Sequence, residues 1–139
     1  MTLSAYIDGA SRGNPGESGI GVLLKDETGN TIATISGYIG KATNNIAEYT
    51  ALLVCVKRAS QLKCNKLVIH SDSELLAHQM NGLYKIKNDG IKKIHQQVMH
   101  ILLKSTFNVE IKHIGREYNQ DADSLANAGI DSKKFIKDV

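Results

Sequence analysis

Four of the 14 acidic residues lie where apolar residues would be expected. Asp8 and Asp72 each follow a run of strand-forming residues, so both are expected at the end of a strand. Glu48 and Asp123 each fall on the apolar stripe of a helical segment, because the small and apolar residues around them recur at helical spacing. If the two strands are parallel neighbours, Asp8 and Asp72 share the carboxyl edge of the sheet, and the two helices can bring Glu48 and Asp123 there.

Such a cluster of carboxylates would form a site for divalent cations. Crowding carboxylates away from water costs several kcal/mol per ion unless cations compensate, and mutual repulsion raises the pKa of some of them. Oxygen ligands without a cluster of His or Cys suit Mg²⁺ or Mn²⁺ rather than zinc. Two such ions about 4 Å apart can activate a water and stabilise the leaving oxygen in phosphodiester cleavage. Taken singly, each residue has an ordinary alternative as a turn former, a helix cap or the partner of an arginine.

The elements that position these residues follow the order β-β-β-α-β-α-α-β-α. Alternating apolar residues and turn-forming residues predict an antiparallel meander of three strands, with turn chemistry at 9–16. Strands are expected at 3–8, 19–25, 31–39, 66–71 and 107–111, and helices at 44–62, 73–82, 91–102 and 119–135. A meander followed by alternating strands and helices indicates an α/β (mixed α+β) fold, a mixed sheet with helices on its faces.

Composition narrows the class of protein. The chain has 139 residues, of which 42% are hydrophobic and 22% charged, so one globular domain over residues 1–139 is expected. No apolar run reaches the length of a membrane span and no secretory leader opens the sequence. Cys55 and Cys64 have neither zinc nor redox spacing, so reduced thiols in a cytoplasmic protein are expected. The net charge of +3 permits a nucleic-acid partner without requiring one.

Four motifs carry a resemblance to a known family and occur in that family's order. They are YIDGASRGNPG at 6–16, TNNIAEY at 43–49, HSDS at 70–73 and NQDADSLA at 119–126. Each is weak alone but together they are specific, and they span residues 6–128. On them the sequence resembles type 1 ribonuclease H, in the short bacterial and archaeal-like form without the basic protrusion. The resemblance implies a five-stranded mixed sheet in the order 3-2-1-4-5, with strands 1–3 antiparallel and helices on both faces.

The resemblance also implies an activity. Asp8, Glu48, Asp72 and Asp123 match the family's catalytic carboxylates, which hold two Mg²⁺ ions, with Mn²⁺ as a substitute. The implied reaction is hydrolysis of the RNA strand of an RNA–DNA hybrid by in-line attack of water, leaving a 5′-phosphate and a 3′-hydroxyl. We therefore expect a metal-dependent endonuclease that binds the hybrid, binds no membrane and is a monomer.

Substrate contacts carry over in the same way. Short polar side chains and close backbone approach suit the wide, shallow minor groove of the hybrid with its 2′-hydroxyls. Thr43 matches a position in the family's pocket for a DNA phosphate, which Asn88 would complete, and a helix N-terminus also favours phosphate. The implied substrate-binding residues are Gly9, Ser11, Arg12, Asn14, Thr43, Asn44, Asn45 and Glu74.

Three departures from the family pattern stand out. Glu74 replaces a glutamine of many relatives, and a carboxylate cannot donate a hydrogen bond to a base edge. The link at 83–89 leaves no room for the basic protrusion, which Lys85, Lys87, Lys92 and Lys93 could replace in part. The third departure is a histidine of the family's mobile loop that assists proton transfer or product release. Counting back from Asn119 points to His113, whereas the alternation of the last strand makes His113 a strand residue and brings Arg116 nearer the site.

Two other functions remain open from the sequence. One is a catalytically weak or inactive module that binds hybrid or double-stranded RNA, and the other is a nuclease that prefers double-stranded RNA or cuts DNA. The complete set of four carboxylates favours an enzyme over a binding module. Asn14, Asn44 and Asn45 favour a substrate with 2′-hydroxyls. A panel of hybrid, double-stranded RNA and DNA substrates would discriminate among these functions.

Overall fold

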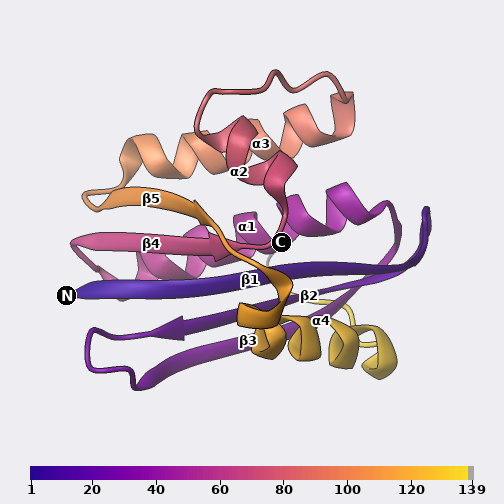
Figure 1. Ribbon diagram of the computed structural model, residues 1–139, viewed down its shortest axis with the longest axis horizontal. Helices are drawn as coiled ribbons and strands as arrows, with labels where there is room; N and C mark the ends of the chain where they lie inside the picture. Colours follow the sequence, from indigo (N-terminus) through magenta and orange to yellow (C-terminus); the bar gives the residue numbers. More distant parts are fainter. Residues whose placement is uncertain (138–139) are drawn as a thin grey trace.

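A five-stranded mixed sheet is the centre of the computed structural model, which describes residues 1–137 (Figure 1). The strands are β1 (Thr2–Gly13), β2 (Gly16–Lys25), β3 (Thr31–Ala42), β4 (Lys66–Ser71) and β5 (Asn108–His113). The helices are α1 (Asn44–Leu62), α2 (Glu74–Met80), α3 (Asp89–Lys104), the short 3₁₀ helix η1 (Arg116–Tyr118) and α4 (Gln120–Ser132). The order β3-β2-β1-β4-β5, with β1–β3 antiparallel and β4 and β5 parallel to β1, confirms the expected topology.

Strand β1 is longer than the sequence pattern predicts. It continues five residues past Asp8, because its antiparallel pairing with β2 persists to Gly13↔Gly16. The predicted turn at 9–16 therefore shrinks to Asn14 and Pro15, and Asp8 lies inside β1 rather than at its end. The parallel ladder between β1 and β4 nevertheless stops at Ile7↔Ser71, so Asp8 and Asp72 are the next residues of their two strands. The expected juxtaposition thus arises at the end of β4.

The last helix is shorter than the prediction of 119–135. It ends at Ser132 because Lys133 takes the left-handed conformation, at φ +54°, that terminates many helices. Phe135 instead forms an isolated bridge with Tyr38 of β3, where the two rings also pack together. The chain end therefore contributes to the packing at the β3 edge.

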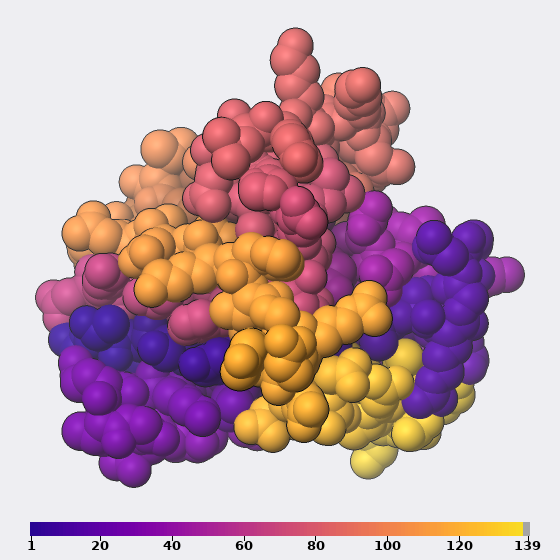
Figure 2. Space-filling view, in the orientation of Figure 1, coloured from indigo at the N-terminus to yellow at the C-terminus, as the bar shows by residue number. Residues whose placement is uncertain are grey.

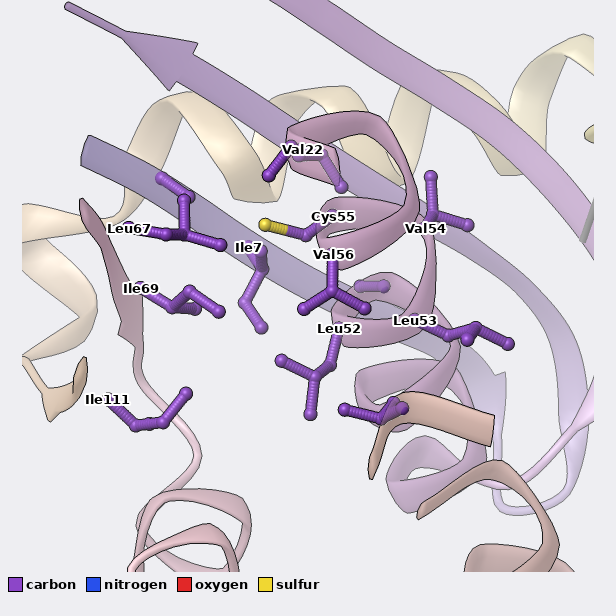
Figure 3. Packing of buried hydrophobic residues seen from close by; sticks show 14 of the residues in the cluster. Ile7, Val22, Leu52, Leu53, Val54, Cys55, Val56, Leu67, Ile69 and Ile111 are labelled. Carbon is purple, nitrogen blue, oxygen red and sulfur yellow. The ribbon is translucent and has the colours of Figure 1, made fainter. Parts of the chain in front are cut away.

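The hydrophobic core lies between α1 and the sheet. In Figure 3, Leu52, Cys55 and Val56 of α1 lie against strand residues that include Ile7 and Ile69. Helix α3 packs on α1, and α4 covers the opposite face of the sheet across β1, β2 and β3 (Figure 1). Among residues 1–137, no helix has the length and apolar character that crossing a membrane would require.

Candidate active site

A cavity of about 430 Å³ opens where the ladder between β1 and β4 stops. All four predicted carboxylates line it, from β1, α1, the end of β4 and α4 respectively. Asp8, Glu48 and Asp72 come closest together: each has an oxygen within 4.8 Å of one on both of the others. The segment that joins β5 to α4, orange in Figure 2, crosses the middle of this face of the molecule with α2 above and α4 below. Three elements distant in sequence therefore present carboxylates at one point.

Asp123 differs from the prediction in its burial. Its side chain is exposed at the rim, because the buried stripe of α4 is Ala122, Ala126, Gly129 and Ile130. The stripe inferred from the sequence is confirmed for Asn119, Ala122, Ala126 and Ile130, which are buried, and it is wrong for Asp123 alone. Asn127, one turn further along α4, donates a hydrogen bond to a carboxylate oxygen of Asp123 at 3.3 Å. Asp123 is thus a rim residue that faces both the cavity and solvent.

Asp8 and Glu48 are held in an environment that disfavours their charge. Asp8 and Glu48 are only 5% and 4% exposed. Burial, followed by repulsion from Asp72, raises the pKa of Asp8 from 3.8 to about 7. Burial, with repulsion from Asp8 and Asp72, also raises the pKa of Glu48 well above its usual range. The side chains of Glu48 and Asp123 also lie close enough to Asp8 to affect its pKa.

One oxygen of this cluster has no partner among the described residues. Oε2 of Glu48 is buried and accepts no hydrogen bond. A buried acceptor left unpaired costs about 1–3 kcal/mol, and more when it is charged. A divalent cation would satisfy this atom and relieve the repulsion that raises the neighbouring pKa values. The all-oxygen donor set therefore fits a hard cation such as Mg²⁺ or Mn²⁺.

Close contact between β1 and α1 sets Glu48 beside Asp8. A Cβ added at Gly9 would lie 2.2 Å from the carbonyl carbon of Ala47 and 2.3 Å from the amide nitrogen of Glu48. The amide of Gly9 also donates to the Glu48 carboxylate, which lowers the pKa of that group against the larger raising effects. Gly9 was expected to allow approach of the substrate, and it does line the cavity. Its lack of a side chain, however, is required by the backbone of α1.

We expect Gly9→Ala to destabilise the fold by about 3 kcal/mol, since α1 would have to move away from β1. Urea unfolding at pH 7 would measure the change. Gly29→Ala is the control, because no atom lies within 4 Å of its added Cβ and only its left-handed φ of +85° adds strain, about 1 kcal/mol. Equal losses in the two variants would contradict the contact argument.

Asn119 is a positioning residue that the sequence did not single out. Its side-chain nitrogen donates to the backbone carbonyl of Ile7 at 2.8 Å, and the residue is 1% exposed. The bond ties the start of α4 to β1 immediately before Asp8. An asparagine before a helix is ordinarily taken for a cap, but this side chain makes no capping hydrogen bond. Only the fold could show that it joins two parts of the site.

The predicted substrate residues divide into two groups. Gly9, Ser11 and Asn44 line the cavity. Outside its lining, Thr43 caps α1 by accepting from the amide of Ile46 at 3.2 Å, and the Asn14 side chain accepts from the amide of Asn44 at 3.1 Å. The bond from Asn44 to Asn14 holds the start of α1 next to the β1–β2 hairpin. The remaining members of the second group are Arg12, Asn45 and Glu74.

Arg12 and Glu74 make other interactions. The guanidinium of Arg12 binds Asp131 of α4 at 2.7 Å, which places it on the outer side of the hairpin. Glu74 accepts from His78 one turn along α2 at 3.2 Å. In this structure neither side chain faces the carboxylate cluster.

The remaining predictions concern the third helix and the loop before α4. Asn88 caps α3 by accepting from the amide of Ile91 at 3.0 Å, and it does not line the cavity. His113 is the last residue of β5, exposed and outside the cavity lining, whereas Arg116 of η1 lines the cavity. Glu117 and Gln120 also line it and were missed. They occupy neither a strand end nor an apolar stripe, so no pattern in the sequence marked them.

Comparison with known proteins adds an independent line of support. The family model described as "Reverse transcriptase-like" matches residues 6–129. The chain is 35% identical over 129 residues to ribonuclease HI of Halobacterium salinarum, covering 93% of this chain. It spans 64% of that relative's length and 36% of the length of three matching mycobacterial proteins.

Two further likenesses extend over nearly the full length of both proteins. Ribonuclease H of Chlorobaculum parvum is 34% identical over 93% of this chain and 95% of its own length. The structure of LC11-RNase H1 in complex with an RNA/DNA hybrid superposes with a TM-score of 0.89 at 40% identity, covering 94% of this chain and 97% of the other. With the sheet order and the four carboxylates, these likenesses show that the chain belongs to the type 1 ribonuclease H family.

Proposed function

We propose that this protein is a metal-dependent endonuclease that hydrolyses the RNA strand of RNA–DNA hybrids. The observation that carries the proposal is the buried cluster of Asp8, Glu48 and Asp72, whose mutual repulsion and unpaired oxygen call for a divalent cation. The similarity to LC11-RNase H1, which was solved with a hybrid bound, supports the choice of substrate.

The four carboxylates have separate places in this proposal. Asp8, Glu48 and Asp72 would hold the metal, with Asp123 at the rim completing the ligands of a second ion. Divalent ions bound there supply activation of the attacking water and charge stabilisation at the leaving 3′ oxygen, giving 5′-phosphate and 3′-hydroxyl ends. Mg²⁺ is the proposed ion and Mn²⁺ its substitute, because both accept oxygen-only ligands.

The chain's own residues orient the substrate around this cluster. Among residues 1–137, Arg116 is the one cationic residue that lines the cavity. We therefore assign to Arg116 the role of binding the negatively charged scissile phosphate. Ser11 and Asn44 lie on the side of the cavity formed by β1 and the start of α1. Hydroxyl and amide groups there suit the 2′-hydroxyls of an RNA strand.

A cleavage assay with defined substrates tests the proposal. The pure folded protein should cut a hybrid with a labelled RNA strand when Mg²⁺ or Mn²⁺ is present, and EDTA should stop the reaction. Double-stranded RNA and DNA duplexes of the same sequence should be cut at least tenfold more slowly. An intact hybrid after incubation with both metals would overturn the proposal, and faster cutting of double-stranded RNA would overturn the choice of substrate.

A further inference from the structure

A basic groove lies between the C-terminal half of α1 and the part of α3 from Lys93 to Lys104, away from the carboxylates. It consists of two hollows of about 440 and 500 Å³ that share His100 and Ile101 as walls. Lys63 and Lys104 line the first hollow, and Lys57 and Lys93 line the second. Each hollow therefore has a lysine from each helix, since α1 and α3 pack side by side.

The described residues that line the two hollows include no Asp or Glu. The other polar lining residues are neutral donors and acceptors, namely Ser60, Gln96, Gln97, Ser105 and Thr106. The sequence shows the same segregation, because 49–71 and 90–109 carry seven Lys or Arg and no Asp or Glu. With a net charge of only +3 for the whole chain, the rest of the molecule is acidic on balance. The positive charge is thus concentrated on the α1–α3 face.

Helix geometry separates the groove from the catalytic cavity. Glu48 lies near the start of α1, and the groove residues Lys57 and Ser60 lie about 14 and 18 Å further along the helix axis at 1.5 Å per residue. Along α3, Lys93, His100 and Lys104 extend over about 16 Å. At a rise of 3.4 Å per base pair along the duplex axis, this row spans the length of about five base pairs.

We propose that this groove is a second nucleic-acid contact, which binds the phosphate backbone of a duplex without regard to sequence. Lysines on both walls provide charge for successive phosphates, and the glutamines and hydroxyls provide hydrogen bonds that do not read bases. The contact would keep the protein on nucleic acid between encounters of the catalytic cavity with substrate. It goes beyond the cleavage activity and does not depend on it.

Binding to a DNA duplex in EDTA isolates this contact, since without metal the catalytic carboxylates repel phosphate. Lys93→Glu together with Lys104→Glu should weaken binding of a fluorescent 20-base-pair DNA duplex at least tenfold in anisotropy titrations. The slope of log affinity against log salt should fall in magnitude by about 2, because two phosphate contacts are lost at about 0.9 each. Lys93→Gln with Lys104→Gln should reproduce the change in slope with a smaller loss of affinity.

The matched control is Lys112→Glu together with Lys134→Glu, which changes the total charge equally at exposed positions outside the groove. Equal weakening by the control would overturn the proposal, because bulk charge alone would then explain binding. Displacement of the duplex by an acidic peptide of equal charge, as effectively as by unlabelled duplex, would overturn the assignment to nucleic acid. Hybrid cleavage is not measured here, so its failure leaves this test unaffected.

Discussion

Asp8→Asn should abolish hybrid cleavage while making the metal-free protein more stable. The substitution keeps the shape of the side chain but removes a charge from the buried cluster with Glu48 and Asp72. Changing a group one step removed from a metal typically costs 10–100-fold in activity. Loss of a direct ligand should cost more, so we expect initial rates on a labelled hybrid to fall at least about 1,000-fold.

The gain in stability follows from the raised pKa of Asp8, about 7 in the folded protein against 3.8 when exposed. One pKa unit corresponds to about 1.4 kcal/mol, and protonation is shared with neighbouring carboxyls, so we expect a gain of about 2–4 kcal/mol at pH 8 in EDTA. At pH 4, where Asp8 is protonated in the folded wild type, the two proteins should be nearly equal in urea unfolding.

Asp121→Asn is the control for both measurements. Asp121 is exposed, lies outside the cavity lining and precedes Asp123 by two residues. Its substitution should leave the cleavage rate within about twofold and the unfolding free energy within about 0.5 kcal/mol, as for most surface changes. Retained cleavage in Asp8→Asn would remove Asp8 from the metal site, and unchanged stability at pH 8 would show that burial does not disfavour its charge.

The sequence was sufficient for the topology, through the motifs that it shares with type 1 ribonuclease H, and for the carboxylates that meet at one cavity. Alternation identified the strands, and the parallel pairing of β1 with β4 placed Asp8 beside Asp72. Glu48 could be assigned to the buried side of α1 because ten other residues of that helix are also buried, so the stripe is broad. When a helix has a broad buried side, a small error in placing the helical periodicity does not change which residues are assigned to that side.

The limits of the narrow buried side of α4 and the direction of the Arg12 side chain could not be predicted from the sequence. The buried stripe of α4 is set by small residues pressed onto the glycines of β2 and β3. A Cβ added at Gly21 would collide with Ala122 and Ala126, and one added at Gly129 would collide with the backbone of Gly37. The other members of the predicted stripe are buried as expected, but the buried side is too narrow to include Asp123 beside Ala122. The direction of the Arg12 side chain depends on Asp131, more than a hundred residues away, so local patterns carry no information about it.

Ends of elements were misjudged where long-range pairing overrides local preference. The Gly-rich segment after Asp8 has turn-forming residues, yet it stays extended because β2 pairs with it as far as Gly13. Glycine at position 9 is also explained only by the fold, through its contact with the backbone of α1. The sequence therefore predicted which residues form the site more reliably than how each of them is held.

Divalent metal should stabilise the protein strongly at pH 8 and weakly at pH 5. The folded pKa of Asp8 is raised, so the folded state binds more protons than the unfolded state between pH 3.8 and about 7. Asp8 accordingly contributes stability below pH 4 that is lost as the pH rises through 7. Metal ions bind the ionised carboxylates in place of those protons. At high pH they therefore restore the folding stability that deprotonation of Asp8 removes.

Thermal unfolding in MgCl₂ or MnCl₂, against NaCl of equal ionic strength, measures this linkage. At a metal concentration 100 times the dissociation constant, binding adds about 2.7 kcal/mol, or roughly 5–10 °C in melting temperature for a chain of this length. Asp8→Asn should lose most of the increase, and Asp121→Asn should keep it. An equal increase at pH 5 and pH 8, or an equal increase in Asp8→Asn, would place the metal elsewhere. Because the readout is stability, the outcome locates the ion whether or not any hybrid is cleaved.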